Sequence, residues 1–209
     1  MTARDRILTR VRRATQADAQ PQVSEEPQRP VPARGMRSGT SALEQFIVEA
    51  EKVHATTSRL DSLDDLPAAL AVELRDRNLP AAIRTGDDPS FDRDWGTVER
   101  STGPGRIAEP ATMTRAIAGS AETGSLVFAS GKTNPVTLNY LGETHFAVVD
   151  ATDIHGGFEG AMEAVRAKGL DSRTVNFVTG PSRSADIGQV LQLGAHGPVA
   201  LHIFIVGSA

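Results

Sequence analysis

The sequence predicts an α/β fold built on a mostly parallel sheet. Segments with strand and helix character alternate over residues 144–206, in the order strand, helix, strand, helix, strand, which is the rhythm of βαβ units. The first and last of these strands are nearly continuous apolar runs, as is typical of strands buried on both faces. A chain of 209 residues, of which 39% are hydrophobic, is long enough to bury the core of one such domain.

The first 40 residues are expected to stand apart from this domain. Apolar residues at positions i, i+1 and i+4 predict a short amphipathic helix over residues 3–14, with an arginine-rich polar side. Residues 16–40 carry four prolines among Gln, Ser and Glu, which predicts a mobile linker. We therefore expect a basic N-terminal helix and a Pro-rich linker over residues 1–40, and a single α/β domain over residues 41–209.

Within residues 41–209, apolar residues three and four apart indicate helices, and short apolar runs indicate strands. We expect strands over residues 53–60 (at a sheet edge), 80–85, 125–129, 144–150, 175–178 and 200–206. A helix is expected to begin at Ser41, and a second, capped by residues 61–65, to end near Asn78. Three more helices are expected: a short one over 135–141, one from Gly156-Gly157 to just before Gly169, and one from Ser182 to Leu193. Residues 86–110 are rich in Gly, Pro and Asp and receive no assignment.

Composition excludes several classes of site and partner. The chain has no cysteine, so it holds no thiolate nucleophile, disulfide, iron–sulfur cluster or cysteine-based zinc site. Its histidines lack metal-ligand spacing, so neither a metal nor a cofactor is expected in this chain. The net charge of −4 argues against nucleic acid as the main partner, and no apolar run is long enough for a membrane span. A cytoplasmic protein is expected.

The first candidate site is the stretch over residues 176–187, where an apolar run ends in Gly-Pro and a helix is predicted to begin. If Ser182 is the N-cap, Arg183 lies on the sheet-facing stripe of that helix, over the carboxyl edge of the sheet where ligands usually bind. Free N–H groups, hydroxyls and a guanidinium would then form an anion site. The alternative is a well-capped helix in which Arg183 pairs with an acid. The candidate ligand-binding residues are Gly180, Pro181, Ser182, Arg183, Ser184 and Asp186.

The second candidate is the segment over residues 121–125, directly before a strand. Glu122, followed by Thr123 and Gly124, could serve as a general base or a nucleophile, with its two neighbours contacting a ligand. Alternatively, Glu122 is a buried carboxylate that accepts backbone N–H groups and locks the turn. The residues alone leave both possibilities open.

The third candidate is a tight loop that holds one imidazole. His196 lies between glycines and a proline just before the last strand, which suits proton transfer or anion binding, with Gly197 as a neighbouring ligand contact. A structural histidine bonded to the loop backbone is the alternative. His145 could face the same crevice, whereas His202, inside an apolar strand, is expected to be a satisfied core residue. Walker, dinucleotide and Gly-x-Ser-x-Gly motifs are absent from the sequence.

Together these three segments resemble the lactate utilization protein C family, whose shared unit is the LUD domain. The matching residues are Ile117 through Leu126 (IAGSAETGSL), Thr179 through Ile187 (TGPSRSADI) and Gly194 through Leu201 (GAHGPVAL). The resemblance is dense over residues 112–206. It implies a three-layer α/β/α fold related to the sugar-phosphate isomerase and CoA-transferase group, and a role in oxidising L-lactate to pyruvate beside two iron–sulfur protein partners.

Two functions are consistent with the resemblance, and a ligand-sensing module with no catalysis is a third, less specific possibility. The first is a non-redox component of L-lactate utilization that binds a small carboxylate or supports assembly, with Arg183 as the clamp and His196 at the 2-hydroxyl proton. The second is an autonomous enzyme of the CoA-transferase or cyclo-ligase type. In that enzyme Glu122 would be the nucleophile or base, and the Gly180–Ser184 turn would bind a phosphate or CoA. The absence of a nucleotide fingerprint favours the first.

Overall fold

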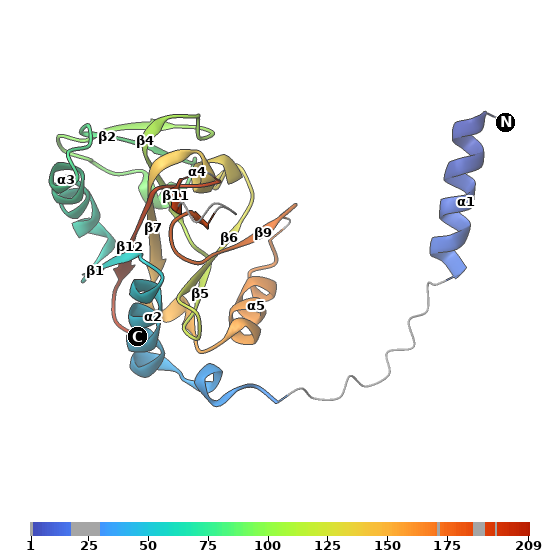
Figure 1. Cartoon of the computed structure of the whole chain (residues 1–209), viewed down its shortest axis with the longest axis horizontal. Helices are drawn as coiled ribbons and strands as arrows, with labels where there is room; N and C mark the ends of the chain where they lie inside the picture. The colour runs from blue at the N-terminus through green and yellow to red at the C-terminus, as the bar shows by residue number, and fades with distance from the viewer. Residues whose placement is uncertain (1, 18–29, 171, 186–190, 195) are drawn as a thin grey trace. The chain divides into compact units, whose positions relative to one another are not determined.

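The computed structural model describes residues 2–17, 30–170, 172–185, 191–194 and 196–209 (Figure 1). The chain forms two compact units, Met1–Val31 and Pro32–Ala209. Part of the predicted mobile linker, residues 18–29, lies outside the described residues. The expected division into residues 1–40 and 41–209 stays a prediction.

The first unit contains helix α1 (Ala3–Ala17), which confirms the predicted amphipathic helix. Thr2 and Asp5 start the helix as a reciprocal cap: the Asp5 N–H donates to Thr2 Oγ1 at 3.3 Å, and the Thr2 N–H donates to Asp5 Oδ2 at 2.9 Å. Its apolar residues Ile7 and Val11 are exposed.

The second unit is organised around a six-stranded sheet in which all neighbouring strands run parallel. The strand order is β1-β12-β7-β4-β2-β3. The strands are β1 (Thr56–Leu60), β2 (Ala82–Thr85), β3 (Glu99–Thr102), β4 (Glu109–Arg115), β7 (Gly142–Asp150) and β12 (Ala200–Val206). β12 and β7 lie inside the sheet and are buried on both faces, as their apolar runs predict, and β1 is an edge strand as expected.

One face of this sheet is covered by helix α3 (Leu66–Asp76). The preceding turn carries a capping box between Ser62 and Asp65, which explains where the helical segment begins. Leucines four residues apart put one apolar stripe of the helix against the sheet. The buried cluster there includes Leu66, Leu70, Leu74, Met113, Phe146, Val148 and Phe204.

The other face is covered by helix α2 (Gly39–Lys52) and by a second, four-stranded sheet (Figure 1). The second sheet has the order β8-β5-β6-β9, with β5 (Ala118–Ser120), β6 (Ser125–Ala129), β8 (Ile154–His155) and β9 (Val175–Val178). Helix α5 (Phe158–Ala167) packs on this sheet through Ala161 and Val165. Helix α4 (Val136–Tyr140) precedes β7. The predicted three-layer α/β/α fold with a mostly parallel sheet is thus confirmed.

The prediction made from the alternation of strands and helices was wrong about the position of one strand. β9 was expected in the parallel sheet, but it pairs antiparallel with β6 in the smaller sheet. β9 is only partly buried, in contrast to the fully buried β7 and β12, so it needs only one covered face. Residues 86–110, which received no sequence assignment, hold the short helix η3 (Pro89–Phe91), strand β3 and the start of β4.

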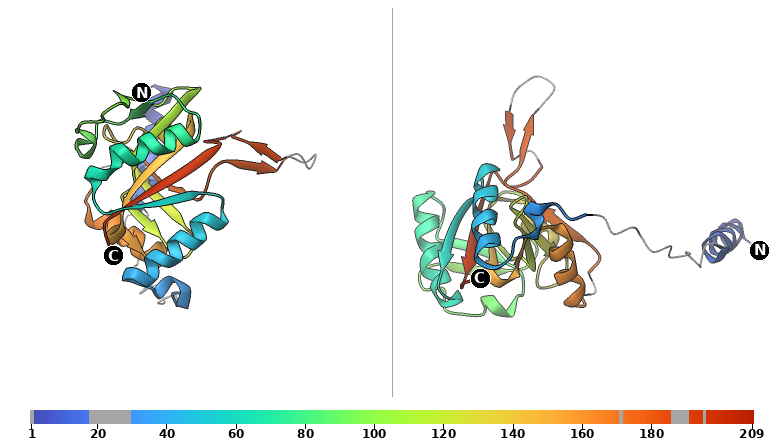
Figure 2. Two further views of the ribbon diagram at one scale, coloured as in Figure 1. Left: turned by 90° about the vertical axis from the view of Figure 1, so that its left-hand side faces the viewer. Right: turned by 90° about the horizontal axis from the view of Figure 1, so that it is seen from below.

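The helix predicted from Ser182 to Leu193 is wrong. Strands β10 (Arg183–Ala185) and β11 (Leu191–Leu193) pair antiparallel instead and form a ribbon that projects from the body (Figure 2). The stretch contains Ser, Asp and Gly, which are weak helix formers. The carbonyl of Ser182 accepts the N–H of Gly194 from the other side of the ribbon, where a helix would have supplied the N–H of a residue four positions on. Residues 186–190, including the candidate ligand residue Asp186, lie outside the described residues.

Candidate functional site

The predicted turn lies at the amino edge of the central sheet, not at its carboxyl edge. The N–H of Ser182 donates to the carbonyl of Pro198 at 2.8 Å, and β12 begins two residues later at Ala200. The N–H of Val199 donates in turn to the carbonyl of Glu143, the second residue of β7. Because all strands of this sheet are parallel, these contacts fix the turn at the end where strands enter.

Two glycines hold two of the motif segments against the last turn of α2. Gly124 has φ 64°, and a Cβ there would lie 2.2 Å from the Ala50 nitrogen. Gly180 has φ 71°, and a Cβ there would lie 2.3 Å from the Val53 carbonyl oxygen. Both positions require the left-handed region and the close backbone approach that only glycine allows. The two segments therefore share α2 as a common support.

A chain of hydroxyls joins the same two segments. Thr123 Oγ1 and Ser125 Oγ are 2.7 Å apart, and Ser125 Oγ and Thr179 Oγ1 are 2.6 Å apart. Each hydroxyl can donate one hydrogen bond and accept others, so the chain can be fully satisfied in either direction. This contact brings the predicted segments 121–125 and 179–186 together, as the sequence expectation required.

Ser182 joins the turn to the histidine loop. Its carbonyl accepts the N–H of Gly194 at 3.2 Å, and its Oγ accepts the N–H of His196 at 3.3 Å. Gly197 lies against the same side chain, since a Cβ built there would sit 3.4 Å from the Ser182 Cβ. Ser182 was expected to cap a helix. Instead it is the residue at which two of the three motif segments meet.

The histidine loop lines a cavity of about 500 Å³. His196 shares this cavity with Tyr140 from the end of α4 and Glu143 from the start of β7, and Leu141 and Val199 add apolar walls. Burial raises the pKa of the Tyr140 phenol above its usual value. The cavity thus offers an imidazole, a protonated phenol and a carboxylate beside apolar surface. Tyr140 carries no motif signal and was missed by the sequence reasoning.

Arg183 is exposed and stands at the base of the projecting ribbon. It does not lie on a sheet-facing helical stripe, because the helix that would have placed it there does not form. It directly follows Ser182 in the sequence. Neither Arg183 nor Glu122 is among the described residues that line the His196 cavity. Of Ser184, the structure describes only the backbone, in β10.

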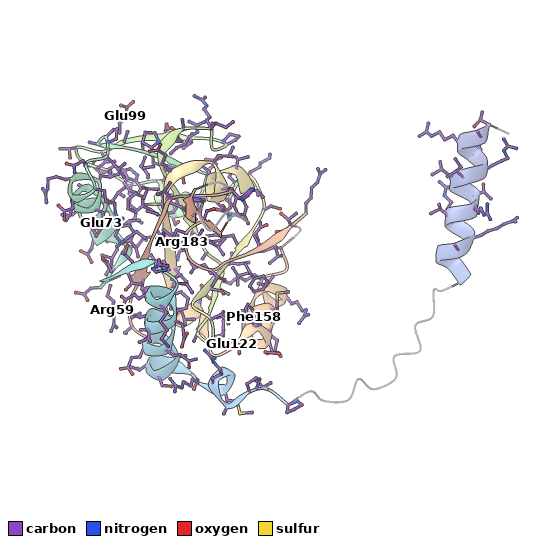
Figure 3. All side chains as sticks on the ribbon, viewed as in Figure 1. Arg59, Glu73, Glu99, Glu122, Phe158 and Arg183 are labelled. Carbon is purple, nitrogen blue, oxygen red and sulfur yellow. The ribbon has the colours of Figure 1, made fainter. Side chains whose placement is uncertain are left out.

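Glu122 occupies a structural position at the start of α5. Its carboxylate accepts the N–H of Phe158 at 3.2 Å, and its own N–H donates to the carbonyl of Gly156 at 2.9 Å. Arg34 donates to its carbonyl oxygen. In Figure 3 Glu122 and Phe158 are labelled close together, whereas Arg183 lies apart from them. Glu122 thus accepts a backbone N–H, as the alternative expected, but it is half-buried and connects its turn to the start of α5.

Two further histidines are buried in the core. His145 does not face a crevice: its Nε2 lies 2.7 Å from Thr114 Oγ1, which also donates to Asn139 Oδ1. Its ring is enclosed because β7 is covered on both faces. Burial lowers the pKa of His145 to about 3, so the imidazole is neutral near pH 7. His202 is a core residue as predicted, with Nδ1 at 2.8 Å from Thr56 Oγ1, but it is not fully satisfied, because its buried Nε2 has no hydrogen-bond partner in the described part of the chain.

Within the described ranges, no group of three or more His, Asp or Glu side chains could hold a metal ion. In the same residues, no helix is long and apolar enough to cross a membrane.

Comparisons with known proteins agree with the motif segments. Residues 110–206 match the family model of the LUD domain. Lactate utilization protein C from Anoxybacillus flavithermus is 34% identical over 86 residues, which are 41% of this chain and 39% of that protein. The protein of the same name from Bacillus subtilis is 34% identical over 90 residues, or 41% of this chain and 38% of that protein. The aligned part thus spans about two fifths of these relatives' length.

The fold also has a counterpart among solved structures. A DUF162 family protein from Deinococcus radiodurans superposes with a TM-score of 0.65 at 21% sequence identity, over 82% of this chain and 99% of that one. At this identity the likeness concerns the fold alone. It extends well beyond residues 110–206, so the first half of the second unit belongs to the same architecture.

Proposed function

Since residues 110–206 match the family model of the LUD domain, we propose that this chain acts in lactate utilization as a non-redox component that binds a small carboxylate. The name that several curated relatives carry, lactate utilization protein C, supports the pathway. One observation supports the binding role: Ser182, in the turn over residues 179–183, accepts N–H groups from Gly194 and His196 in the loop over residues 194–198.

The junction suits a small 2-hydroxy acid. Arg183 is exposed beside Ser182 and can form a bidentate pair with a carboxylate. His196 lies in the adjoining loop and lines a cavity that also presents the Tyr140 phenol, so an imidazole is at hand for the proton of a 2-hydroxyl. The apolar walls formed by Leu141 and Val199 fit a short methyl-bearing body.

Electrons released from lactate would have to leave through other proteins. The chain has no cysteine and so supplies no iron–sulfur ligation. We therefore assign the redox steps to iron–sulfur protein partners and keep a cytoplasmic location as part of the proposal. Affinity capture from lactate-grown cells tests this assignment. Co-purification of iron–sulfur proteins supports it, and a chain that is recovered alone under native conditions speaks against it.

Calorimetric titration with L-lactate and pyruvate tests the binding role. Loss of a charge-assisted bidentate contact costs about 1.5–3 kcal/mol, so Arg183→Ala should weaken binding by about tenfold to a hundredfold. Arg59→Ala is the matched control, because Arg59 is also an exposed arginine and lies on the edge strand β1 (Figure 3). Equal affinities of wild type and Arg183→Ala would remove the carboxylate-binding role.

The second candidate, a CoA-transferase or cyclo-ligase that uses Glu122, has less support. The Glu122 carboxylate is engaged by the N–H of Phe158, and its segment does not line the His196 cavity. Acyl-CoA transfer assays of wild type and Glu122→Gln separate the two functions. We expect no hydroxylamine-trappable intermediate in either protein. An intermediate that forms only in the wild type would favour the transferase.

A further inference from the structure

A second cavity, of about 320 Å³, lies at the carboxyl edge of the central sheet, opposite to the Ser182 junction. Arg115 is the last residue of β4 and Asp150 is the last residue of β7, and both line it. Asp88 lines it from the segment that follows β2, and Lys168 from the end of α5. We call this space the carboxyl-edge cavity. The sequence motifs discussed above contribute none of its charged residues.

The topology of the sheet makes this position a place for a ligand. From β2 the chain moves to β3 on one side, whereas from β4 it proceeds to β7 on the other side. β2 and β4 are neighbours, so the strand order reverses between them. In open α/β sheets, ligands bind in the crevice outside the carboxyl ends of strands at such a switch point. Asp88 and Arg115 follow or end these two strands.

The charged groups of the cavity form two ion pairs. Arg115 pairs with Asp150, and Lys168 Nζ lies 3.1 and 3.0 Å from the two carboxylate oxygens of Asp153. All four side chains are only partly buried, with exposed fractions between 25% and 36%, so a ligand can reach them. Asp88 adds a third carboxylate, one oxygen of which accepts the N–H of Ser90.

A polar wall completes the cavity. Asn134 is 6% exposed and donates from Nδ2 to the carbonyl of Ala129 at 3.2 Å, while its buried Oδ1 has no partner in the described part of the chain. Ser130 accepts the N–H of Thr174 through its Oγ, so its hydroxyl hydrogen is available to a ligand. The Asn134 oxygen is enclosed in the wall, so the polar groups that a ligand can reach are the Ser130 hydroxyl and the partly exposed charged side chains.

We propose that the carboxyl-edge cavity binds a small zwitterion of the α-amino acid class. A ligand with a single charge could pair with only one sign of the cavity's charged groups, whereas the cavity presents both signs. A zwitterion carries both charges: its carboxylate can form ion pairs with Arg115 and Lys168, and its ammonium group can form ion pairs with Asp150 and Asp153. The volume lies at the small end of the range for ligand pockets, which suits a molecule of amino-acid size.

Calorimetric titration of the full chain with each of the twenty L-amino acids tests the proposal. At least one should bind saturably, and its decarboxylated amine and its 2-hydroxy acid analogue should each bind at least about tenfold more weakly, since each lacks one charged contact. Lys168→Met should weaken amino-acid binding by about tenfold or more. Lys132→Met is the matched control, because Lys132 is exposed on the neighbouring loop and does not line the cavity.

Three results would overturn the proposal: no saturable binding by any amino acid, equal affinity for the amine or hydroxy acid analogue, or unchanged affinity in Lys168→Met. Lys168 is the most informative position to substitute, because its ion pair with Asp153 is partly exposed and its loss should affect folding little. Arg183→Ala should leave amino-acid binding unchanged. Failure of amino-acid binding at this cavity and failure of lactate binding at the other edge can therefore be distinguished.

Discussion

Gly180 is the residue at which the loop junction tolerates a side chain least. Its φ of 71° and the 2.3 Å approach of a Cβ to the Val53 carbonyl oxygen act together. Gly180→Ala should lower the free energy of unfolding by more than about 2 kcal/mol. Gly96→Ala is the control: Gly96 has φ 58° but no atom within 4 Å of its Cβ, so it should cost only about 1 kcal/mol. Equal losses in urea unfolding would refute the close approach.

The buried histidines predict how stability depends on pH. Burial lowers the pKa of both His145 and His202 to about 3, with Arg77 adding to the effect at His202. In the unfolded chain each pKa is about 6.5, so the unfolded state binds more protons between these values. Their contribution is complete above pH 6.5 and falls by up to about 1.4 kcal/mol per pH unit for each ring as the pH drops towards 3.

Imidazole NMR signals measure this directly. The ring resonances of both residues should stay at their neutral positions from pH 7 to pH 5, and the free energy of unfolding should fall over the same range. A ring that titrates near pH 6.5 in the folded protein would contradict the burial described for it.

Among the elements, helix α5 depends on a side chain from a distant segment. Glu122 accepts the N–H of Phe158, the first residue of the helix. Glu122→Ala should lower the free energy of unfolding by about 1 kcal/mol, the usual cost of a lost cap, whereas Glu122→Gln keeps an acceptor oxygen and should cost less. Chemical denaturation compares the two variants. A larger loss for Glu122→Gln than for Glu122→Ala would show that the cap is not the source of the effect.

The ribbon β10–β11 is the element for which the sequence predicted the wrong secondary structure. Ile187 and Val190 fit a helical stripe that starts at Arg183, but helices are decided by tertiary contacts when local propensity is weak. Hydrogen bonds from Gly194 and His196 to Ser182 supply those contacts, and no local pattern reveals them. Cross-strand nuclear Overhauser contacts between Ser184 and Gln192 should be seen, in agreement with the register. Sequential helical contacts over residues 183–185 would contradict it.

For the whole molecule, the apolar pattern of the sequence predicted the layers of the fold. It did not predict at which edge of the central sheet the Ser182 junction lies. Continuous runs such as 144–150 and 200–206 predicted buried parallel strands because only strands covered on both faces read that way. β9 lies in the second sheet, antiparallel to β6, and not in the parallel central sheet. The turn that follows β9 therefore contacts the amino edge of the central sheet, where a strand of that sheet would have led to the carboxyl edge. The motif residues were found from their types, whereas their shared supports, α2 and Ser182, depend on packing.

Consumption of L-lactate by cells that lack this chain tests the central claim most directly. Loss of the chain should abolish growth on L-lactate and leave growth on pyruvate intact, because the proposed role ends at pyruvate. Wild type and Arg59→Ala should restore lactate consumption, whereas Arg183→Ala should not. Consumption at the wild-type rate without the chain would contradict the account.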